Sequence, residues 1–129
     1  MIVNAGIVEL AKLMGGETAD GFLYIATGTG TTAAASGDTT LGTEKYRVLA
    51  TIERSSTIAP LDTIRLWGIV TATANATLSE FGIFNHDTAG DMLARKLISP
   101  TKAITTGQKC LMVWDLGVHD GGFSGGTGC

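Results

Sequence analysis

The side chains best suited to acid–base chemistry near neutral pH are two histidines, His86 and His119. In a hydrolase of the serine type, one of them would take the proton of a nearby serine hydroxyl. Nothing in the sequence brings a particular serine to either histidine, since His86 stands in a predicted hairpin loop and His119 follows the last predicted strand. We therefore interpret both as solvated turn residues and predict that the chain is not an enzyme.

Two loops carry groups that bind small ions in other proteins. Asp87 and Asp91 stand four residues apart, but a calcium loop offers more oxygen ligands at tighter spacing. The run Gly28-Thr29-Gly30 begins like a phosphate-binding loop, yet the lysine and the helix that must follow are absent. We interpret the two aspartates as part of a polar turn and predict neither a metal ion nor a cofactor.

Four arginines, Arg47, Arg54, Arg65 and Arg95, are a different kind of candidate, because three of them lie within predicted strands. The planar guanidinium pairs well with carboxylates across a protein boundary, so arginines on a sheet face are typical of an interface. An ordinary solvated sheet face explains them equally well, and both interpretations stay open. The candidate interface residues are Arg47, Arg65 and Arg95, together with Gly28, Thr29 and Gly30 of the glycine-rich loop.

The composition limits the classes of protein to which the chain can belong. It has 129 residues and a formal net charge of −3, which excludes a general nucleic-acid binder, since phosphate neutralisation needs clustered Lys and Arg. Hydrophobic residues make up 44% of the chain, enough for a sizeable core in one domain. No apolar run approaches the roughly 20 residues that a membrane-spanning helix needs, so no membrane partner is predicted.

The two cysteines, Cys110 and Cys129, form no Cys-x-x-Cys pair and imply no disulfide framework. Cys110 stands in an apolar run and is interpreted as a small buried hydrophobic residue. The N-terminus has neither a basic region nor a long apolar stretch, so no secretory leader is expected. We predict that the chain is made in a reducing cytoplasm.

The elements that must position these residues are one helix followed by strands. The spacing of Ile7, Leu10, Ala11 and Met14 predicts a helix from about Ala5 to Met14, with its apolar stripe packed against the rest of the protein. Asn4 is the expected N-cap. Period-two alternation and turn residues then predict strands over residues 22–27, 45–53, 62–73, 78–85, 92–99 and 109–118, with a hairpin loop at 86–90.

This order of elements predicts a mostly β protein, an antiparallel sandwich or jelly-roll-like barrel with one short N-terminal helix. Residues 1–120 are expected to form a single domain, and residues 121–129 a glycine-rich C-terminal tail. The predicted core residues are Ile25, Val48, Ile52, Leu66, Phe81, Ile83, Leu93 and Trp114.

Two segments, residues 28–43 and 121–129, are rich in small and polar residues and have few large apolar side chains. Because fixing each backbone residue costs roughly 1–2 kcal/mol, such chain gains little from folding alone. We therefore expect both segments to be mobile in the free protein and to serve as contact arms, ordered by strand pairing with a partner.

Several short motifs, taken in order, resemble those of small virion proteins of tailed bacteriophages, in particular capsid decoration (cement) proteins. The resemblance extends from about Asn4 to Leu116. It rests on Asn4-Ala5-Gly6 with the short helix, the run from Phe22 to Thr32, Thr40 to Glu44, Tyr46-Arg47-Val48, Leu78 to Asn85, Gly90 to Arg95, and Val113 to Leu116.

The resemblance implies a structural protein on the outer surface of a phage head, made in the host cytoplasm. Its expected partners are copies of itself, most simply a trimer at three-fold positions of the shell, and the major capsid protein. The alternative is a tail or tail-fibre attachment module, which we expect to continue into a long fibre region beyond Cys129. A third possibility, a sugar-binding module, calls for exposed aromatic residues that the predicted loops almost entirely lack.

Overall fold

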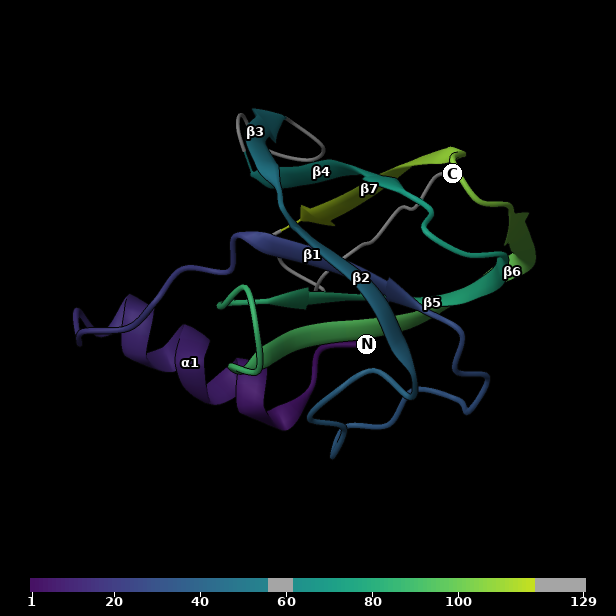
Figure 1. The fold of residues 1–129 in the computed structure, drawn as a ribbon. Helices are drawn as coiled ribbons and strands as arrows, with labels where there is room; N and C mark the ends of the chain where they lie inside the picture. Colours follow the sequence, from purple (N-terminus) through teal and green to yellow (C-terminus); the bar gives the residue numbers. More distant parts are fainter. Residues whose placement is uncertain (56–61, 118–129) are drawn as a thin grey trace.

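A computed structural model describes residues 1–55 and 62–117, which form one helix and seven strands (Figure 1). These are α1 (Asn4–Met14), β1 (Tyr24–Gly28), β2 (Glu44–Leu49), β3 (Thr51–Ser55), β4 (Thr63–Thr71), β5 (Ala76–Phe84), β6 (Met92–Ile104) and β7 (Lys109–Gly117). The predicted tail at 121–129 and His119 lie outside the described residues.

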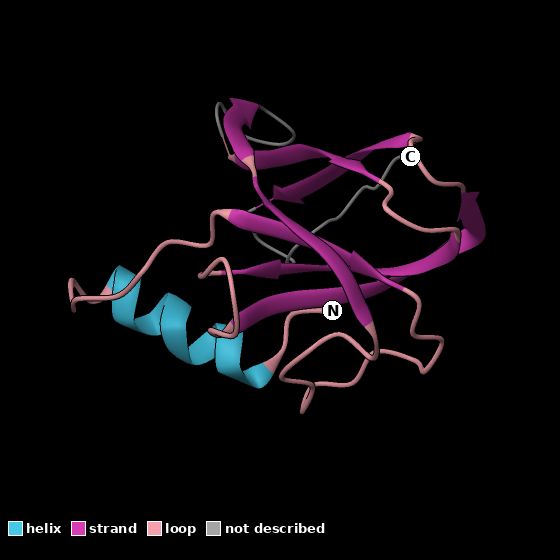
Figure 2. Ribbon diagram, viewed as in Figure 1, coloured by secondary structure: helices cyan, strands magenta, loops and turns pink. Residues whose placement is uncertain are grey.

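The strands form two antiparallel sheets that pack together, as Figure 2 shows. One sheet has four strands in the order β2-β1-β5-β6, and the other has three in the order β3-β4-β7. The helix lies beside β6, and residues 1–3 run along that strand, with the Val3 N–H donating to the Leu93 carbonyl at 3.0 Å. The mostly β, antiparallel sandwich with one N-terminal helix is confirmed.

The core between the sheets contains most of the side chains predicted for it. Phe81 and Ile83 on β5 are completely buried, and Trp114 on β7 is 2% exposed. Ile25, Leu66 and Leu93 are also buried, and Val48 is partly buried against them. Ile52 was predicted to join them but is 39% exposed, so that assignment is wrong.

The strand predicted over residues 45–53 in fact divides at Ala50, and this explains Ile52. β2 belongs to the four-stranded sheet and β3 to the three-stranded sheet, with the buried Ala50 N–H donating to the Leu23 carbonyl at 2.7 Å. Since β3 is an edge strand, Ile52 pairs with Leu66 on one side and has no described strand on the other. Continuous alternation therefore predicted one strand where the chain changes sheets.

The hairpin between β5 and β6 is confirmed, although β6 continues to Ile104, beyond its predicted end. Its loop is closed by Asn85, whose side-chain Oδ1 accepts the Asp91 N–H at 2.7 Å. Gly90 adopts a φ of 72°, and a Cβ there would lie 2.6 Å from that same Oδ1. Both the left-handed backbone and the limited space therefore favour glycine at this turn.

The helix covers the predicted residues but uses a different face. Its N-cap is Val3, which makes no side-chain cap, so the prediction of Asn4 as the cap is wrong. Gly6 lies so close to β6 that a Cβ would stand 2.5 Å from the Leu93 carbonyl oxygen. Leu10 packs on the core, whereas Ile7 and Met14 of the predicted stripe are 53% and 87% exposed. Because Gly6 has no side chain, the helix can pack closely against β6 through a face that the spacing of apolar residues does not predict.

Candidate functional site: a buried ion cluster and two sheet faces

The most concentrated set of polar groups surrounds Glu80, whose side chain is fully buried on β5. A carboxylate removed from water is stable only when it is paired and hydrogen-bonded. Its Oε1 accepts N–H bonds from Gly30 and Thr43, both at 2.8 Å, and its Oε2 accepts the Gly42 N–H at 2.9 Å. Three backbone donors of the segment between β1 and β2 therefore converge on one side chain of β5.

Arg95 on β6 completes this cluster and is itself only 2% exposed. Its Nε and Nη2 contact the Glu80 carboxylate at 3.0 and 2.9 Å, and its Nη1 contacts Asp38 Oδ2 at 2.9 Å. The remaining N–H groups donate to the carbonyls of Thr32 at 2.8 Å and Ala33 at 3.3 Å. All five N–H donors of the guanidinium thus have acceptors within the chain.

The protonation states follow from these contacts. Burial alone would raise the pKa of Glu80, but the N–H groups of Thr43, Gly42 and Gly30 and the Arg95 guanidinium outweigh it and hold that pKa below its usual range. Burial likewise opposes the charge on Arg95, yet its pKa is raised because Asp38 and Glu80 accept its hydrogen bonds. The Ala35 N–H and Arg95 lower the pKa of Asp38. All three groups are therefore charged at neutral pH.

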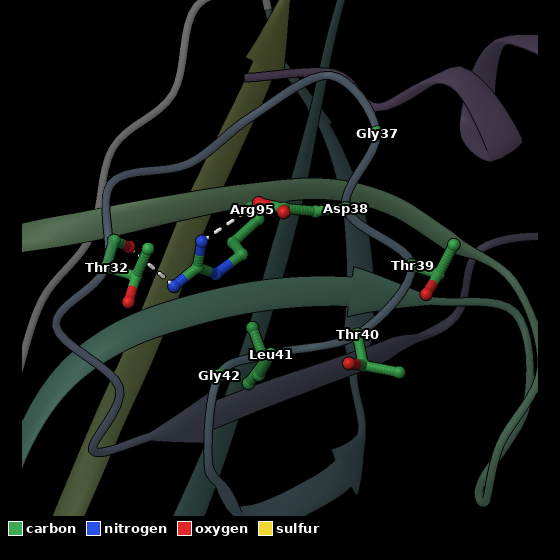
Figure 3. A pocket seen from close by; sticks show the side chains of 8 residues that line it. All are labelled: Thr32, Gly37, Asp38, Thr39, Thr40, Leu41, Gly42 and Arg95. Atoms are coloured by element: carbon green, nitrogen blue, oxygen red, sulfur yellow. Dashed lines mark hydrogen bonds and ion pairs between the residues drawn. The ribbon is translucent and has the colours of Figure 1, made fainter.

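A polar hollow of about 380 Å³ lies beside this cluster (Figure 3). It is lined by Thr32, Gly37, Asp38, Thr39, Thr40, Leu41, Gly42 and Arg95. Figure 3 shows Arg95 held between Asp38 and Thr32, with its guanidinium enclosed by the loop. Because every Arg95 donor already has an acceptor, this residue has none left for an anion in the hollow. The buried ion cluster therefore serves to hold this loop in place.

This arrangement corrects the prediction that residues 28–43 are mobile in the free protein. Besides the bonds to Glu80 and Arg95, the Thr29 N–H donates to the Thr43 carbonyl at 2.9 Å, and the Asn4 N–H donates to the Ser36 carbonyl at 2.8 Å. Leu41 is 4% exposed and packs with Phe84 and neighbouring residues on the outer side of the four-stranded sheet. The segment is an ordered cover, and its contacts come from within the chain.

The candidate interface residues therefore divide into accessible and enclosed ones. Gly28 is buried at the end of β1, the Thr29 and Gly30 N–H groups face acceptors within the chain, and Arg95 is buried instead of lying on a solvated sheet face. No surface of Arg95 is thus available to a partner. Sequence reasoning missed Glu80, although a charged residue inside the run Leu78–Phe84, which reads as a strand, was a signal for a buried pair.

Arg47 on β2 is also largely enclosed, with its side chain 7% exposed. It pairs with Glu44 at 2.6 Å and donates to the carbonyls of His86 and Ala89 at 2.9 and 2.8 Å. Its guanidinium carbon lies 3.6 Å from the centre of the Phe84 ring, within the range of a cation–π contact. Arg47 therefore ties β2 to the β5–β6 hairpin.

Arg65 is the accessible member of the predicted set, with its side chain 45% exposed on the outer face of the three-stranded sheet. It makes a bidentate pair with Asp115 of β7, with N···O distances of 2.7 and 2.9 Å. Hydrogen bonding to Arg65 lowers the pKa of Asp115, and the same contact raises that of Arg65. This pair lies open to solvent, unlike the Glu80–Arg95 pair.

The structure places the remaining candidates in exposed or buried positions away from this cluster. His86 lies in the exposed hairpin, with its Nε2 2.8 Å from Asp20 Oδ2. Asp87 and Asp91 are exposed in the same hairpin, and residues 1–55 and 62–117 contain no group of three or more His, Cys, Asp or Glu placed to hold a metal ion. Cys110 is buried as predicted, but it is disulfide-bonded, although the spacing of the two cysteines implied no disulfide framework. The sequence's other cysteine, Cys129, lies outside the described residues.

Comparison with known proteins gives no relative for this chain: no family model, curated protein or solved structure matches it. Within the described part of the chain, no helix is both long and apolar enough to cross a membrane.

Proposed function

We propose that the chain is a structural virion protein that decorates the outer surface of a tailed-phage head. The identity of the particle comes from the ordered sequence motifs between Asn4 and Leu116. Its proposed partners are the major capsid protein and further copies of the chain, assembled as a trimer at three-fold positions of the shell. Its work is to hold subunits together by contact.

The observation that carries this proposal is that the protein exposes large apolar side chains on two separate surfaces. On α1, Ile7 and Val8 are 53% and 54% exposed. On the outer face of the three-stranded sheet, Ile69 and Leu111 are 51% and 47% exposed. Gathered apolar side chains at a surface are typical of protein–protein contact sites, because their burial by a partner is favourable.

The buried ion cluster supports the same proposal in a different way. Glu80 and Arg95 are the most deeply buried charged groups in the described residues. Their hydrogen bonds hold the cover in place over the four-stranded sheet. A protein that binds a shell by contact benefits from a rigid surface, since less chain must be ordered when it binds. The cluster supplies that rigidity.

The copy number per particle tests the proposal most directly. Virions of the phage that encodes the chain would be purified, and the chain quantified by mass spectrometry against the major capsid protein. Hundreds of copies per particle are expected for a head decoration protein, whereas a handful would favour the tail or tail-fibre alternative. Absence from the particle would refute both assignments.

A cryo-electron microscopy map of the same particles provides the second test. Density for the sandwich is expected on the outside of the head, grouped around local three-fold positions. Density confined to the tail, or to the inside of the shell, would contradict the proposal.

A further inference from the structure

The outer face of the three-stranded sheet has an apolar centre that no described residue covers. Strand register sets Trp67 opposite Val113, and Ile69 opposite Leu111, so these four side chains form a two-by-two block on β4 and β7. Ile69 and Leu111 are about half exposed, and the other two are partly buried. The alternate residues Leu66, Val70, Met112 and Trp114 point to the core and are buried.

The two ends of this face carry opposite charge. At one end Glu53, Arg65 and Asp115 lie in one row across the three strands, which leaves one net negative charge. At the other end Lys109 stands opposite Thr71, and its Nζ donates to the Thr71 hydroxyl at 2.9 Å. Among residues 1–55 and 62–117, no carboxylate lies within ion-pair distance of Lys109, so this end is net positive.

We propose that this face is the docking site of a second copy of the chain, with the two sheets packed face to face about a two-fold axis. A two-fold contact requires a patch that is complementary to itself. This face meets that requirement, because it has an apolar centre and ends of opposite sign. A partner of a different kind would not need the negative and positive ends to balance in this way.

The charges also select the orientation of the axis, which must lie in the plane between the two sheets. If the axis ran along the strands, each end would meet the like-charged end of the other copy, which is unfavourable. If it runs across the strands, Lys109 of each copy approaches the row of Glu53, Arg65 and Asp115 in the other. The strands of the two facing sheets are then antiparallel, at the usual sheet spacing of about 10 Å.

This inference goes beyond the proposed function and can fail independently of it. A two-fold contact doubles whatever assembly the other surfaces produce. A trimer formed elsewhere on the molecule would thus be paired into an assembly with an even number of copies.

The first experiment measures the mass of the full chain in solution by size exclusion with multi-angle light scattering. We expect an even multiple of the 13.3 kDa chain mass for the wild type. Ile69→Lys should halve that mass, because it places a charge at the centre of the contact. The matched control is Leu49→Lys, which alters a residue that is 64% exposed on β2, away from this face, and should leave the mass unchanged.

The second experiment tests the orientation by charge reversal. Lys109→Glu makes both ends of the face negative, and we expect it to raise the dissociation constant roughly tenfold, since a two-fold axis counts each change twice. Adding Glu53→Lys to that variant restores opposite ends with the signs exchanged, and affinity should return. Both residues are exposed, and circular dichroism would show that each variant remains folded.

Three results would overturn the inference. They are a wild-type mass of one chain or an odd multiple at high concentration, an Ile69→Lys variant with the wild-type mass, and a double charge reversal that fails to recover affinity.

Discussion

The outer faces of the two sheets differ in whether another part of the chain covers them. Over the four-stranded sheet, the segment between β1 and β2 folds back as a cover that inserts Leu41 and is pinned by Glu80 and Arg95. Over the three-stranded sheet, Ile69 and Leu111 stand half exposed, beside an open pair between Arg65 and Asp115. One face is closed by the chain itself, and the other presents an apolar surface.

The difference shows how a segment with few apolar residues can be ordered without a hydrophobic core of its own. The cover has one large apolar anchor, Leu41, so most of its ordering must come from hydrogen bonds to buried charges. Charge-assisted bonds of this kind are stronger than neutral ones and become stronger still away from water. The exposed pair of the other sheet has similar distances but remains screened by solvent.

The largest effect on stability should come from removing the Glu80 carboxylate, which accepts the hydrogen bonds of the cover. Glu80→Ala leaves Arg95 as a buried charge without its main partner and frees three backbone N–H groups, so we expect a loss of about 3–5 kcal/mol in the free energy of unfolding. Urea denaturation measures this loss. Glu53→Ala, on the exposed row of the other sheet, is the control and should change stability by no more than about 0.5 kcal/mol. Equal effects of the two variants would contradict the comparison.

A pair of aliphatic truncations compares the covered and open faces directly. Leu41→Ala removes a side chain that is 4% exposed, and it should cost about 2–3 kcal/mol, because a cavity remains beneath the cover. Ile69→Ala removes one that is 51% exposed, and should cost less than about 1 kcal/mol in dilute solution, where copies are apart. Denaturation of both variants at low protein concentration measures the two losses in the free energy of unfolding. Equal losses would contradict the difference between the covered and the open face.

The carboxyl groups of the buried ion cluster should make the free energy of unfolding depend on pH. The pKa values of Glu80 and Asp38 are lowered in the folded state, so their contribution is complete above the unfolded values of about 4 and is lost as the pH falls through the folded values. We expect the free energy of unfolding to decrease below about pH 5, and more steeply in the wild type than in Glu80→Gln. An identical acid slope in the two proteins would show that Glu80 does not carry the effect.

The smallest effect concerns the exposed pair on the open face. Asp115→Asn removes the bidentate charge pair with Arg65, and we expect a loss of no more than about 1 kcal/mol, because both side chains remain in contact with water. Adding about 0.5 M salt should remove much of this difference by screening, while leaving the Glu80→Ala effect largely unchanged. Salt titrations of both variants provide the measurement.

Sequence patterns predicted the fold where contacts follow a local period. Period-two alternation predicted a strand over residues 109–118, and β7 occupies Lys109–Gly117, with the predicted core residue Trp114 buried. Where the period was the wrong guide, the prediction failed: the alternation over 45–53 continued through Ala50, although the chain changes sheets there.

The candidate site was predicted poorly, because its contacts connect distant parts of the chain. The Gly30 N–H finds its acceptor on Glu80, 50 residues later, and Arg95 reaches the Thr32 carbonyl 63 residues earlier. Local composition therefore predicted a mobile segment at 28–43, whereas the donors and acceptors that order it lie on β5 and β6. Arg65, by contrast, was placed correctly on an exposed sheet face by alternation alone.

The order of the strands also determines when the protein can fold as the ribosome makes it. β1 is completed at Gly28 but its partner β5 begins at Ala76, and β4 is completed at Thr71 but pairs with β7, which ends at Gly117. One edge of β4 therefore stays unpaired until β7, and with it almost all of the described residues, has been synthesised. Long-range pairs of this kind also form slowly. The open edge of β4 and its core-facing side chains Leu66 and Val70 are thus available to other nascent copies before the sandwich closes, so dense translation on one messenger would favour aggregation during synthesis.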